Sequence, residues 1–396
     1  MLAMSRRLRT VHRITGLQVL VFRALWAHNI PLVVTGADKR LRASWSPEGL
    51  AKLYGEHNVT VLDSRHSRPR KTTAREFFEE LSRDDREYEI KLKDWPPSSS
   101  FKEDLPNHFH DFMQAVPMPF YTRDDGFENV TTHFPSPPPK GKSFKPDIGP
   151  KEYGANCPKD GNGSTCLHLD VTSAVNILVW SARTAEQNGG ALWHIFAPED
   201  SEKIRTYLCL RRDGTSPTDP IHEQATYLTP AMLEDLRNIG VVPYEIRQRP
   251  GETVFIPAGC AHQVACDFLC IEGIVQSAKI TGELRKGGAQ DLLQLDTMLW
   301  HAWHSLCLQL EQIRAKPQVP TPTGSTLKRK QSRQKTSARN DQHRRKLRRV
   351  VDAIDFSAPL SNVYKCLHPQ CEGLDRGFKT LDAIYSHLWA LSLLTE

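Results

Sequence analysis

Residues 165–170 read TCLHLD and place His168 two positions before Asp170. Side chains at i and i+2 lie on the same face of a β-strand. A third candidate ligand, His262, ends the segment GCAH at residues 259–262. Two imidazoles and one carboxylate form the facial triad of non-haem Fe(II) sites, which leaves positions open for oxygen and a co-substrate. We therefore predict that His168, Asp170 and His262 bind a metal; core histidines beside a surface aspartate are the competing interpretation.

The residues around both motifs predict a β-rich block. Residues 168–180 alternate and then become continuously apolar, and ALWHIF at 191–196 predicts a second buried strand. PGETVFIPAGCAHQV at residues 250–264 combines two turns, an apolar strand and the distal histidine, which is the second metal-binding motif of cupin-type double-stranded β-helices. We expect a further strand over residues 268–275. The predicted class is α+β, a double-stranded β-helix (a jelly-roll or cupin-like barrel) with surrounding helices.

Helix start signals organise the flanking regions. Ser46 and Pro47 form an N-cap and first turn, and Thr73 with Glu76 fits a capping box. We expect residues 1–150 to be a mixed helix and strand part of the same unit as a barrel at 151–285. An amphipathic leucine stripe predicts a helix over 286–315 that packs on the barrel, with dimerisation as the alternative. Residues 316–360 are predicted to be a basic linker, and 361–396 a small tail.

Composition restricts the location and the partners. The 396 residues carry a net charge of only +6, so the basic excess is local, and it is concentrated in residues 328–349. That segment indicates disorder, nuclear import or nucleic-acid contact, with a solvated linker as the alternative. Nine cysteines without a CxxC pair indicate reduced thiols in the cytosol or nucleus. The Arg-rich start is not a convincing signal peptide, and no apolar run is long enough to span a membrane.

The tail contains an incomplete zinc-finger pattern. Cys366, Cys371 and His387 have the order of C2H2 ligands, but no second histidine follows at the usual spacing. Structural zinc is bound by four ligands. Both a degenerate zinc finger and a small metal-free helical tail fit these residues.

The motifs together resemble those of the JmjC-domain histone lysine demethylases, most closely the subgroup acting on histone H3 lysine 9 that includes the hairless-related enzymes. The matching stretches are FRALW (22–26), LKDWPP (92–97), PDIGPKEY (146–153), LHLDV (167–171), ALWHI (191–195) and FIPAGCAHQV (255–264). The resemblance implies a JmjC barrel with Fe(II), and 2-oxoglutarate and O2 as co-substrates. It further implies an oxidoreductase that demethylates the histone H3 tail and acts in the nucleus in chromatin and transcription regulation.

The co-substrate contacts show one departure from this family. By position, Thr165 would donate to the distal carboxylate of 2-oxoglutarate, and Asn176 would point into the barrel toward co-substrate or substrate; for Asn176 a hydrogen-bonded core amide is an equal alternative. Family members carry a lysine ten residues after the distal histidine, where this chain has Glu272. Opposite charges 4 Å apart attract by about 4 kcal/mol at an effective dielectric near 20. Reversing that charge is expected to weaken co-substrate binding by orders of magnitude. Lys279 would help only through a bulge, unless a basic residue elsewhere compensates.

These observations leave several functions open. The first is an active Fe(II)- and 2-oxoglutarate-dependent demethylase of methyl-lysine on histone H3. The second, motivated by Glu272, is a catalytically impaired JmjC protein that binds chromatin. The third is a JmjC protein hydroxylase, and a cupin of unrelated activity is the last.

Overall fold

The computed structural model describes most of the first 315 residues and two short strands beyond them. The described residues are 9–16, 18–66, 68–83, 88–97, 100–133, 149–156, 165–182, 189–212, 218–263, 267–268, 273–289, 293–315, 364–365 and 377–378. The chain divides into two compact units, Met1–Ser305 and Leu306–Glu396. The candidate site lies in the first unit. In the second unit, β12 (Tyr364–Lys365) and β13 (Gly377–Phe378) form an antiparallel pair.

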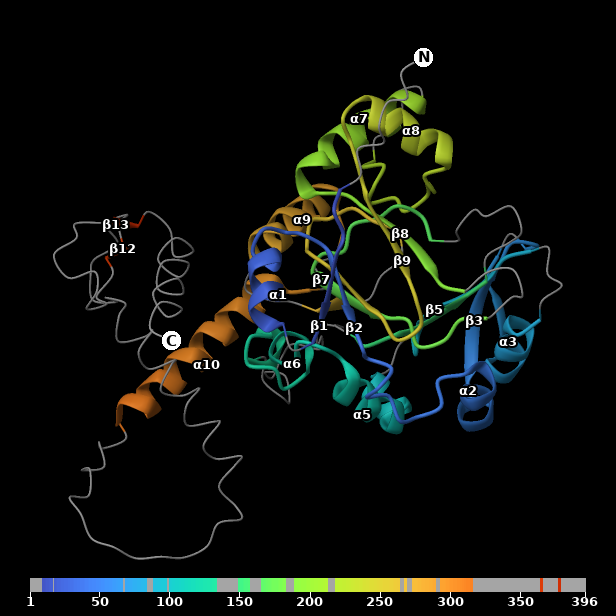
Figure 1. Ribbon diagram of the computed structural model, residues 1–396, viewed down its shortest axis with the longest axis horizontal. Coiled ribbons are helices and arrows are strands. Elements are labelled where there is room, and N and C mark those ends of the chain that lie inside the picture. Colours follow the sequence, from blue (N-terminus) through green and yellow to red (C-terminus); the bar gives the residue numbers. More distant parts are fainter. Residues whose placement is uncertain are drawn as a thin grey trace, which may run out of the picture. The chain divides into compact units, whose positions relative to one another are not determined.

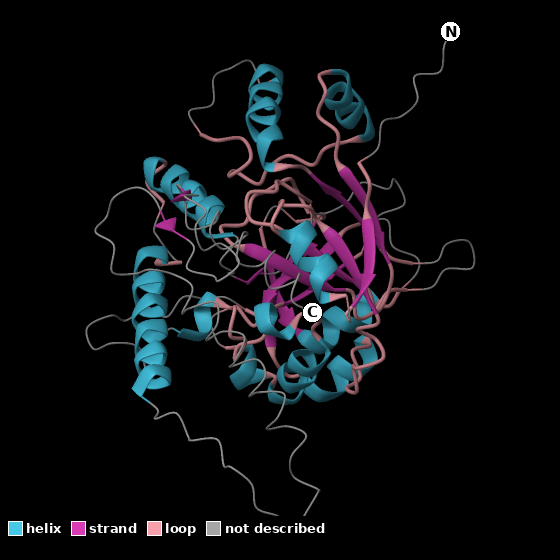
Figure 2. Ribbon diagram, turned by 60° about the vertical axis from the view of Figure 1, so that its left-hand side comes forward, coloured by secondary structure: helices cyan, strands magenta, loops and turns pink. Residues whose placement is uncertain are grey.

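A five-stranded sheet at the centre of the first unit forms one wall of the barrel (Figures 1 and 2). Its order is β1 (His12–Thr15), β2 (Leu32–Thr35), β10 (Thr253–Ile256), β7 (Ser173–Ile177) and β11 (Asp267–Phe268). Alternate residues of β10 face opposite sides. Phe255 packs on Phe22 and Trp26 of α1 (Val19–Trp26). Val254 and Ile256 instead share a core cluster with Trp193, Ile195 and Ile246, on the second wall.

That second wall is the antiparallel pair β8 (Ala191–Ile195) and β9 (Tyr244–Gln248). The apolar cluster between the two walls closes the barrel, so the predicted α+β double-stranded β-helix is confirmed. Within it, buried Trp193 donates its Nε1–H to Gln248 Oε1 at 2.8 Å. This bond satisfies two polar groups that would otherwise be buried without partners.

A four-stranded sheet lies beside the barrel in the order β4 (Arg70–Thr73), β3 (Asn58–Asp63), β5 (Ile90–Trp95), β6 (Glu152–Ala155). The helices α2 (Pro47–Tyr54) and α3 (Ala74–Leu81) cover one face of it (Figure 1). Both predicted helix starts are confirmed: Ser46 Oγ accepts from the Gly49 N–H, and Thr73 and Glu76 form the capping box. Ile90 and Leu92 of β5 point into the core that these helices form. Consequently Lys91 lies on the opposite face of the sheet.

The remaining helices surround these sheets. They are α4 (Phe101–Asp104), α5 (Pro106–Ala115), α6 (Pro119–Thr122), α7 (Ser201–Arg211), α8 (Pro230–Asn238), α9 (Ile274–Lys286) and α10 (Leu295–Ala315), with 3-10 turns at Val130–His133 and Pro198–Asp200. An apolar cluster joins α7, α8 and α9 to Leu167, Leu169 and Ala261, the neighbours of the two predicted histidine ligands. Burial of these neighbours fixes which way the intervening side chains point.

The strand expected over residues 268–275 is present at Phe268 and wrong at Ile274 and Val275, while residues 269–272 lie outside the described residues. β11 ends at Phe268, and α9 begins at Ile274. The buried face of α9 consists of Ser277, Ile280 and Thr281. This spacing is helical, but two of the three residues are polar, so an apolar pattern could not reveal the helix. Lys279 therefore lies on a helix and not on a strand, where Glu283 faces it at 3.9 Å.

The C-terminal helix also begins later than expected. α9 extends to Lys286, and α10 starts at Leu295 instead of residue 286. α10 packs against Val130 through Leu295, Met298 and Ala302. Trp303, on the same helix, is exposed. The face of α10 that packs therefore includes Met298 and Ala302 and does not coincide with the leucine stripe.

Several predictions concern residues outside the described part of the chain. These are Glu272, the linker 316–360 with its basic segment 328–349, and the tail residues Cys366, Cys371 and His387. The proposed domain limits likewise stay predictions. Among the described residues, no helix combines the length and the apolar character needed to cross a membrane.

Candidate metal centre

Backbone pairing brings the two candidate histidines together. His168 and His262 lie opposite each other in an antiparallel bridge, and the N–H of each donates to the carbonyl of the other at 2.9 Å. His262 also pairs with Ile195, the last residue of β8. A tight turn precedes His262, in which Gly259 has φ +83° and a Cβ would meet Gln276 Oε1 at 2.9 Å. Glycine is therefore required at this turn.

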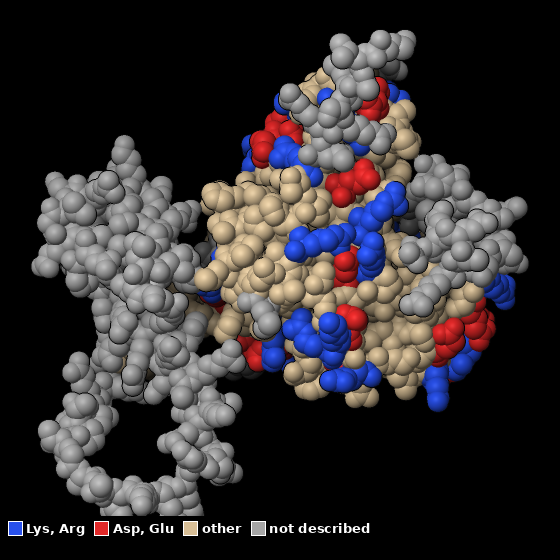
Figure 3. All heavy atoms as spheres, in the orientation of Figure 1, with Lys and Arg blue, Asp and Glu red and all other residues tan. Residues whose placement is uncertain are grey.

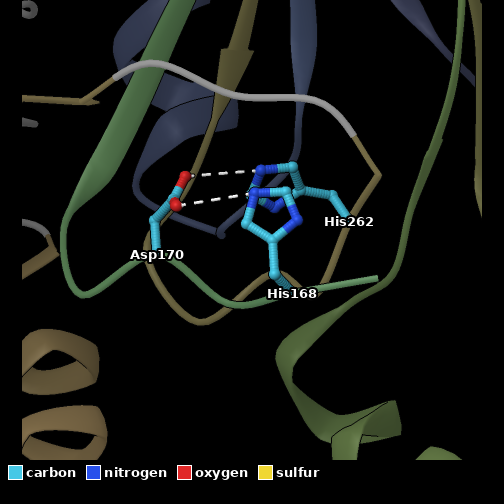
Figure 4. A group of neighbouring side chains, drawn as sticks. All are labelled: His168, Asp170 and His262. Atoms are coloured by element: carbon cyan, nitrogen blue, oxygen red, sulfur yellow. Dashed lines mark ion pairs between the residues drawn. The ribbon is translucent and has the colours of Figure 1, made fainter. Parts of the chain in front are cut away.

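The three predicted ligands converge on one point (Figure 4). Asp170 Oδ1 lies 3.7 Å from His168 Nε2, and Asp170 Oδ2 lies 3.3 Å from His262 Nε2. The candidate ligand atoms of all three residues lie within 4.8 Å of one another. Ligands roughly 2.1 Å from one ion lie about 3 Å apart at right angles. Small side-chain shifts thus bring all three onto a single metal ion.

Hydrogen bonds orient both imidazoles for metal binding. His168 Nδ1–H donates to the Cys166 carbonyl at 2.9 Å, and His262 Nδ1–H donates to the Cys260 carbonyl at 2.8 Å. A carbonyl only accepts, so each Nε2 carries the lone pair. Such outer hydrogen bonds are typical of metal-ligating histidines.

Burial and charge suit the same role. Burial, together with neighbouring His262, lowers the pKa of His168 to about 4, so this imidazole is neutral at pH 7. His262 Nε2 is fully buried and makes no hydrogen bond within the described part of the chain. A buried lone pair aimed at a carboxylate is costly without a partner. The donor set therefore fits a divalent metal ion such as Fe(II).

The two predicted co-substrate residues lie in different surroundings. Thr165 Oγ1 accepts a hydrogen bond from Lys91 Nζ at 2.5 Å. Asn176 Oδ1 accepts from Gln248 Nε2 at 3.2 Å, which places its amide toward the second wall of the barrel. This contact suits the core-amide interpretation of Asn176 as well as the co-substrate one. Lys91 was not among the residues that we predicted from the sequence. Its position between Ile90 and Leu92 could have indicated a lysine on a buried strand.

A second acidic group lies between α7 and α9. Asp219, His222 and Glu283 are close enough to hold a metal. However, Arg205 already pairs with Asp219 at 2.7 Å and with Glu283 at 2.8 Å. The guanidinium neutralises both carboxylates and would repel a cation. We interpret this group as an ion-pair network that ties α7 to α9.

Removing Arg205 is expected to destabilise the fold. Arg205→Met leaves Asp219 and Glu283 close together without their cation, which should lower the free energy of unfolding by about 2–3 kcal/mol. Chemical denaturation measures this change. The matched control is Arg211→Met on the same helix, whose exposed pair with Asp235 should be worth less than about 1 kcal/mol. Equal effects of the two substitutions would contradict the network.

Comparison with known proteins shows which family model and which relatives this chain is similar to. Residues 160–275 match the family model described as "JmjC domain, hydroxylase". Lysine-specific demethylase 3A of Mus musculus is 33% identical over 346 residues, covering 71% of this chain and 26% of the relative. The same-named protein of Homo sapiens is 31% identical over 344 residues, with coverages of 71% and 26%. The Homo sapiens "Probable JmjC domain-containing histone demethylation protein 2C" is 30% identical over 345 residues, with coverages of 71% and 13%. The chain spans about a quarter or less of the length of these relatives.

Proposed function

The chain contains a JmjC domain, as its motifs predicted, and on that premise we propose that it is an Fe(II)- and 2-oxoglutarate-dependent oxygenase that demethylates lysine on histone H3. The observation that carries the proposal is the convergence of His168, Asp170 and His262 inside the matched region. Two neutral nitrogens and one carboxylate on one face leave the opposite positions of an ion open. The relatives whose names state a demethylase activity support the choice of reaction.

Each triad residue has a separate task in this proposal. Bound iron would supply O2 activation: O2 is the oxidant, one of its atoms hydroxylates the N-methyl group, and the other enters the succinate formed as 2-oxoglutarate loses CO2. The unstable hydroxymethyl amine then releases formaldehyde. His168 and His262 hold the metal through Nε2 while their Nδ1–H groups stay bonded to backbone carbonyls. Asp170 provides the anionic ligand. The indole of Trp193 is inclined by 26° to the His262 ring, with centroids 6.2 Å apart, and both side chains are buried.

The finer assignments extend the same proposal. We assign lysine 9 of histone H3 as the target, chromatin as the partner and the nucleus as the location, since the motifs resemble that subgroup most closely. Lys and Arg alternate with Asp and Glu on the described face drawn in Figure 3. We therefore assign nucleic-acid contact to the basic segment 328–349, and not to this face.

Product analysis tests the activity. We expect the iron-loaded protein to release formaldehyde from a methylated histone H3 peptide in a reaction that requires 2-oxoglutarate, and His168→Ala to abolish the release. Mass spectrometry follows the peptide in the same reaction. A gain of one oxygen without loss of a methyl group would instead identify a protein hydroxylase.

Glu272 is the reason for considering a second function, that of a JmjC protein that binds chromatin without catalysis. If its charge prevents co-substrate binding, the chain is a chromatin-binding protein without turnover. Binding of 2-oxoglutarate by the wild-type protein at physiological concentration would refute this alternative. Binding only after Glu272→Lys would support it.

A further inference from the structure

A buried lysine lies next to the proposed co-substrate site. Lys91 is only 8% exposed, and its Nζ donates to Thr165 Oγ1. Lysine is rarely buried to this extent, so the position of this ammonium group is unusual. Residue 91 sits on β5 between two hydrogen-bonded neighbours, since it pairs with Leu62 of β3 and Ala155 of β6. The backbone that carries this ammonium group is therefore held rigidly.

The local charges favour an added anion at this position. Burial and the nearby Lys93 lower the pKa of Lys91 to about 8, although Cys166, Asp94 and Glu89 act in the opposite direction. Because the pKa of Lys91 is lowered overall, Cys166, Asp94 and Glu89 offset only part of the free-energy cost of burying the ammonium group. A carboxylate brought beside Nζ would stabilise the charged form. The hydroxyl of Thr165 would supply a second donor to the same carboxylate.

The short sequence separation between Thr165 and His168 is compatible with a short diacid. Thr165 precedes His168 by three residues, which span at most about 10 Å of extended chain. The four carbon–carbon bonds of 2-oxoglutarate cover roughly 5 Å. A metal–oxygen bond at one end and a hydrogen bond at the other add about 5 Å. A keto acid bound at the triad is therefore long enough to span the separation to Thr165, and Lys91 Nζ lies beside that hydroxyl.

We propose that Lys91, together with Thr165, binds the distal carboxylate of 2-oxoglutarate and replaces the lysine that related proteins carry where this chain has Glu272. This inference rests on the proposed function and deepens it, because it names the cation of the co-substrate site. It also explains how the chain can bind a dianion despite the glutamate. Lys279 is not that cation, since it points to Glu283 from α9.

Calorimetry with two keto acids tests the assignment. The protein is loaded with Mn(II) in place of iron, so that binding is measured without turnover. The ligands are 2-oxoglutarate and 2-oxopentanoate, which has the same chain length but a methyl group instead of the distal carboxylate. We expect Lys91→Met to weaken 2-oxoglutarate binding about 10- to 100-fold. Binding of 2-oxopentanoate should change less than about threefold.

Lys93→Met is the matched control. Lys93 lies two residues away on the same face of β5, but it is exposed and contacts Gln224 at 3.5 Å. Solvent and salt screen its charge, so we expect at most about a threefold effect on either ligand. Equal losses for both ligands in Lys91→Met would overturn the carboxylate contact and indicate a structural role. A wild-type affinity of Lys91→Met for 2-oxoglutarate would overturn it as well.

The pH dependence gives a second readout. In the protein without 2-oxoglutarate, Lys91 loses its proton near pH 8, and it must carry that proton to bind a carboxylate. The affinity for 2-oxoglutarate should therefore fall above that pH, up to tenfold per unit. Lys91→Arg should remove this fall, because a guanidinium stays charged. A fall of the same size with 2-oxopentanoate would refute the assignment. Mn(II) binding without binding of either keto acid would refute the proposed function itself, and this inference with it.

Discussion

Asp170→Ala is expected to reduce metal affinity at the triad by at least about 100-fold and to abolish turnover. Within the described part of the chain, Asp170 contributes the only carboxylate that faces both His168 Nε2 and His262 Nε2. Two neutral imidazoles alone neither balance the charge of a divalent ion nor complete a three-point face. Loss of a supporting residue outside the ligand set already costs 10- to 100-fold in metal affinity, so loss of a ligand should cost more. Titration of the metal-free protein with Mn(II) or Co(II) measures the change.

The control for this substitution is an aspartate outside the site. Asp235→Ala removes a half-exposed carboxylate of α8 that pairs with Arg211, and it should leave metal affinity unchanged. Asp170→Glu keeps the charge on a longer side chain and should bind more weakly than the wild type but more tightly than Asp170→Ala. Metal binding by Asp170→Ala at wild-type strength would mean that the triad is not the metal site.

The convergence of His168, Asp170 and His262 could be anticipated from the sequence because its signals are local. The i, i+2 spacing of His168 and Asp170 and the Pro-x-Gly turn before His262 each fit within a few residues. Only the pairing of the two segments depends on tertiary structure. The antiparallel bridge between His168 and His262 brings them together. The helix caps at Ser46 and Thr73 were predictable for the same reason, since a cap bonds to an N–H three residues away.

Contacts between distant segments could not be read from the sequence. Lys91 and Thr165 are 74 residues apart in the chain, and they meet only because β5 presents its outer face to the start of the histidine segment. The helix α9 was missed because its buried residues Ser277 and Thr281 are polar. Whether such polar residues are buried depends on the groups that the rest of the fold places around them. The periodicity of apolar residues carries no information about this burial.

Phe255→Ala is expected to lower the free energy of unfolding by about 3–5 kcal/mol, the largest stability effect we predict for a single side chain. Phe255 is fully buried on β10, and its ring contacts Phe22 at 4.9 Å and Trp26 at 5.8 Å between centroids. Truncation removes these contacts and leaves a cavity between α1 and the five-stranded sheet. Urea denaturation followed by tryptophan fluorescence measures the loss.

The same substitution links the core to the metal site. β10 leads through the Gly259 turn to His262, so the strand that Phe255 anchors also positions a proposed ligand. A metal that binds only the folded state stabilises it in proportion to the logarithm of its free concentration over its dissociation constant. We therefore expect added Mn(II) to stabilise Phe255→Ala less than wild type if the ligand shifts.

Leu53→Ala, which truncates an exposed leucine of α2, is the control for the stability loss and should change the free energy of unfolding by less than about 0.5 kcal/mol. A loss of similar size in both variants would contradict the assignment of Phe255 to the core that supports the metal centre.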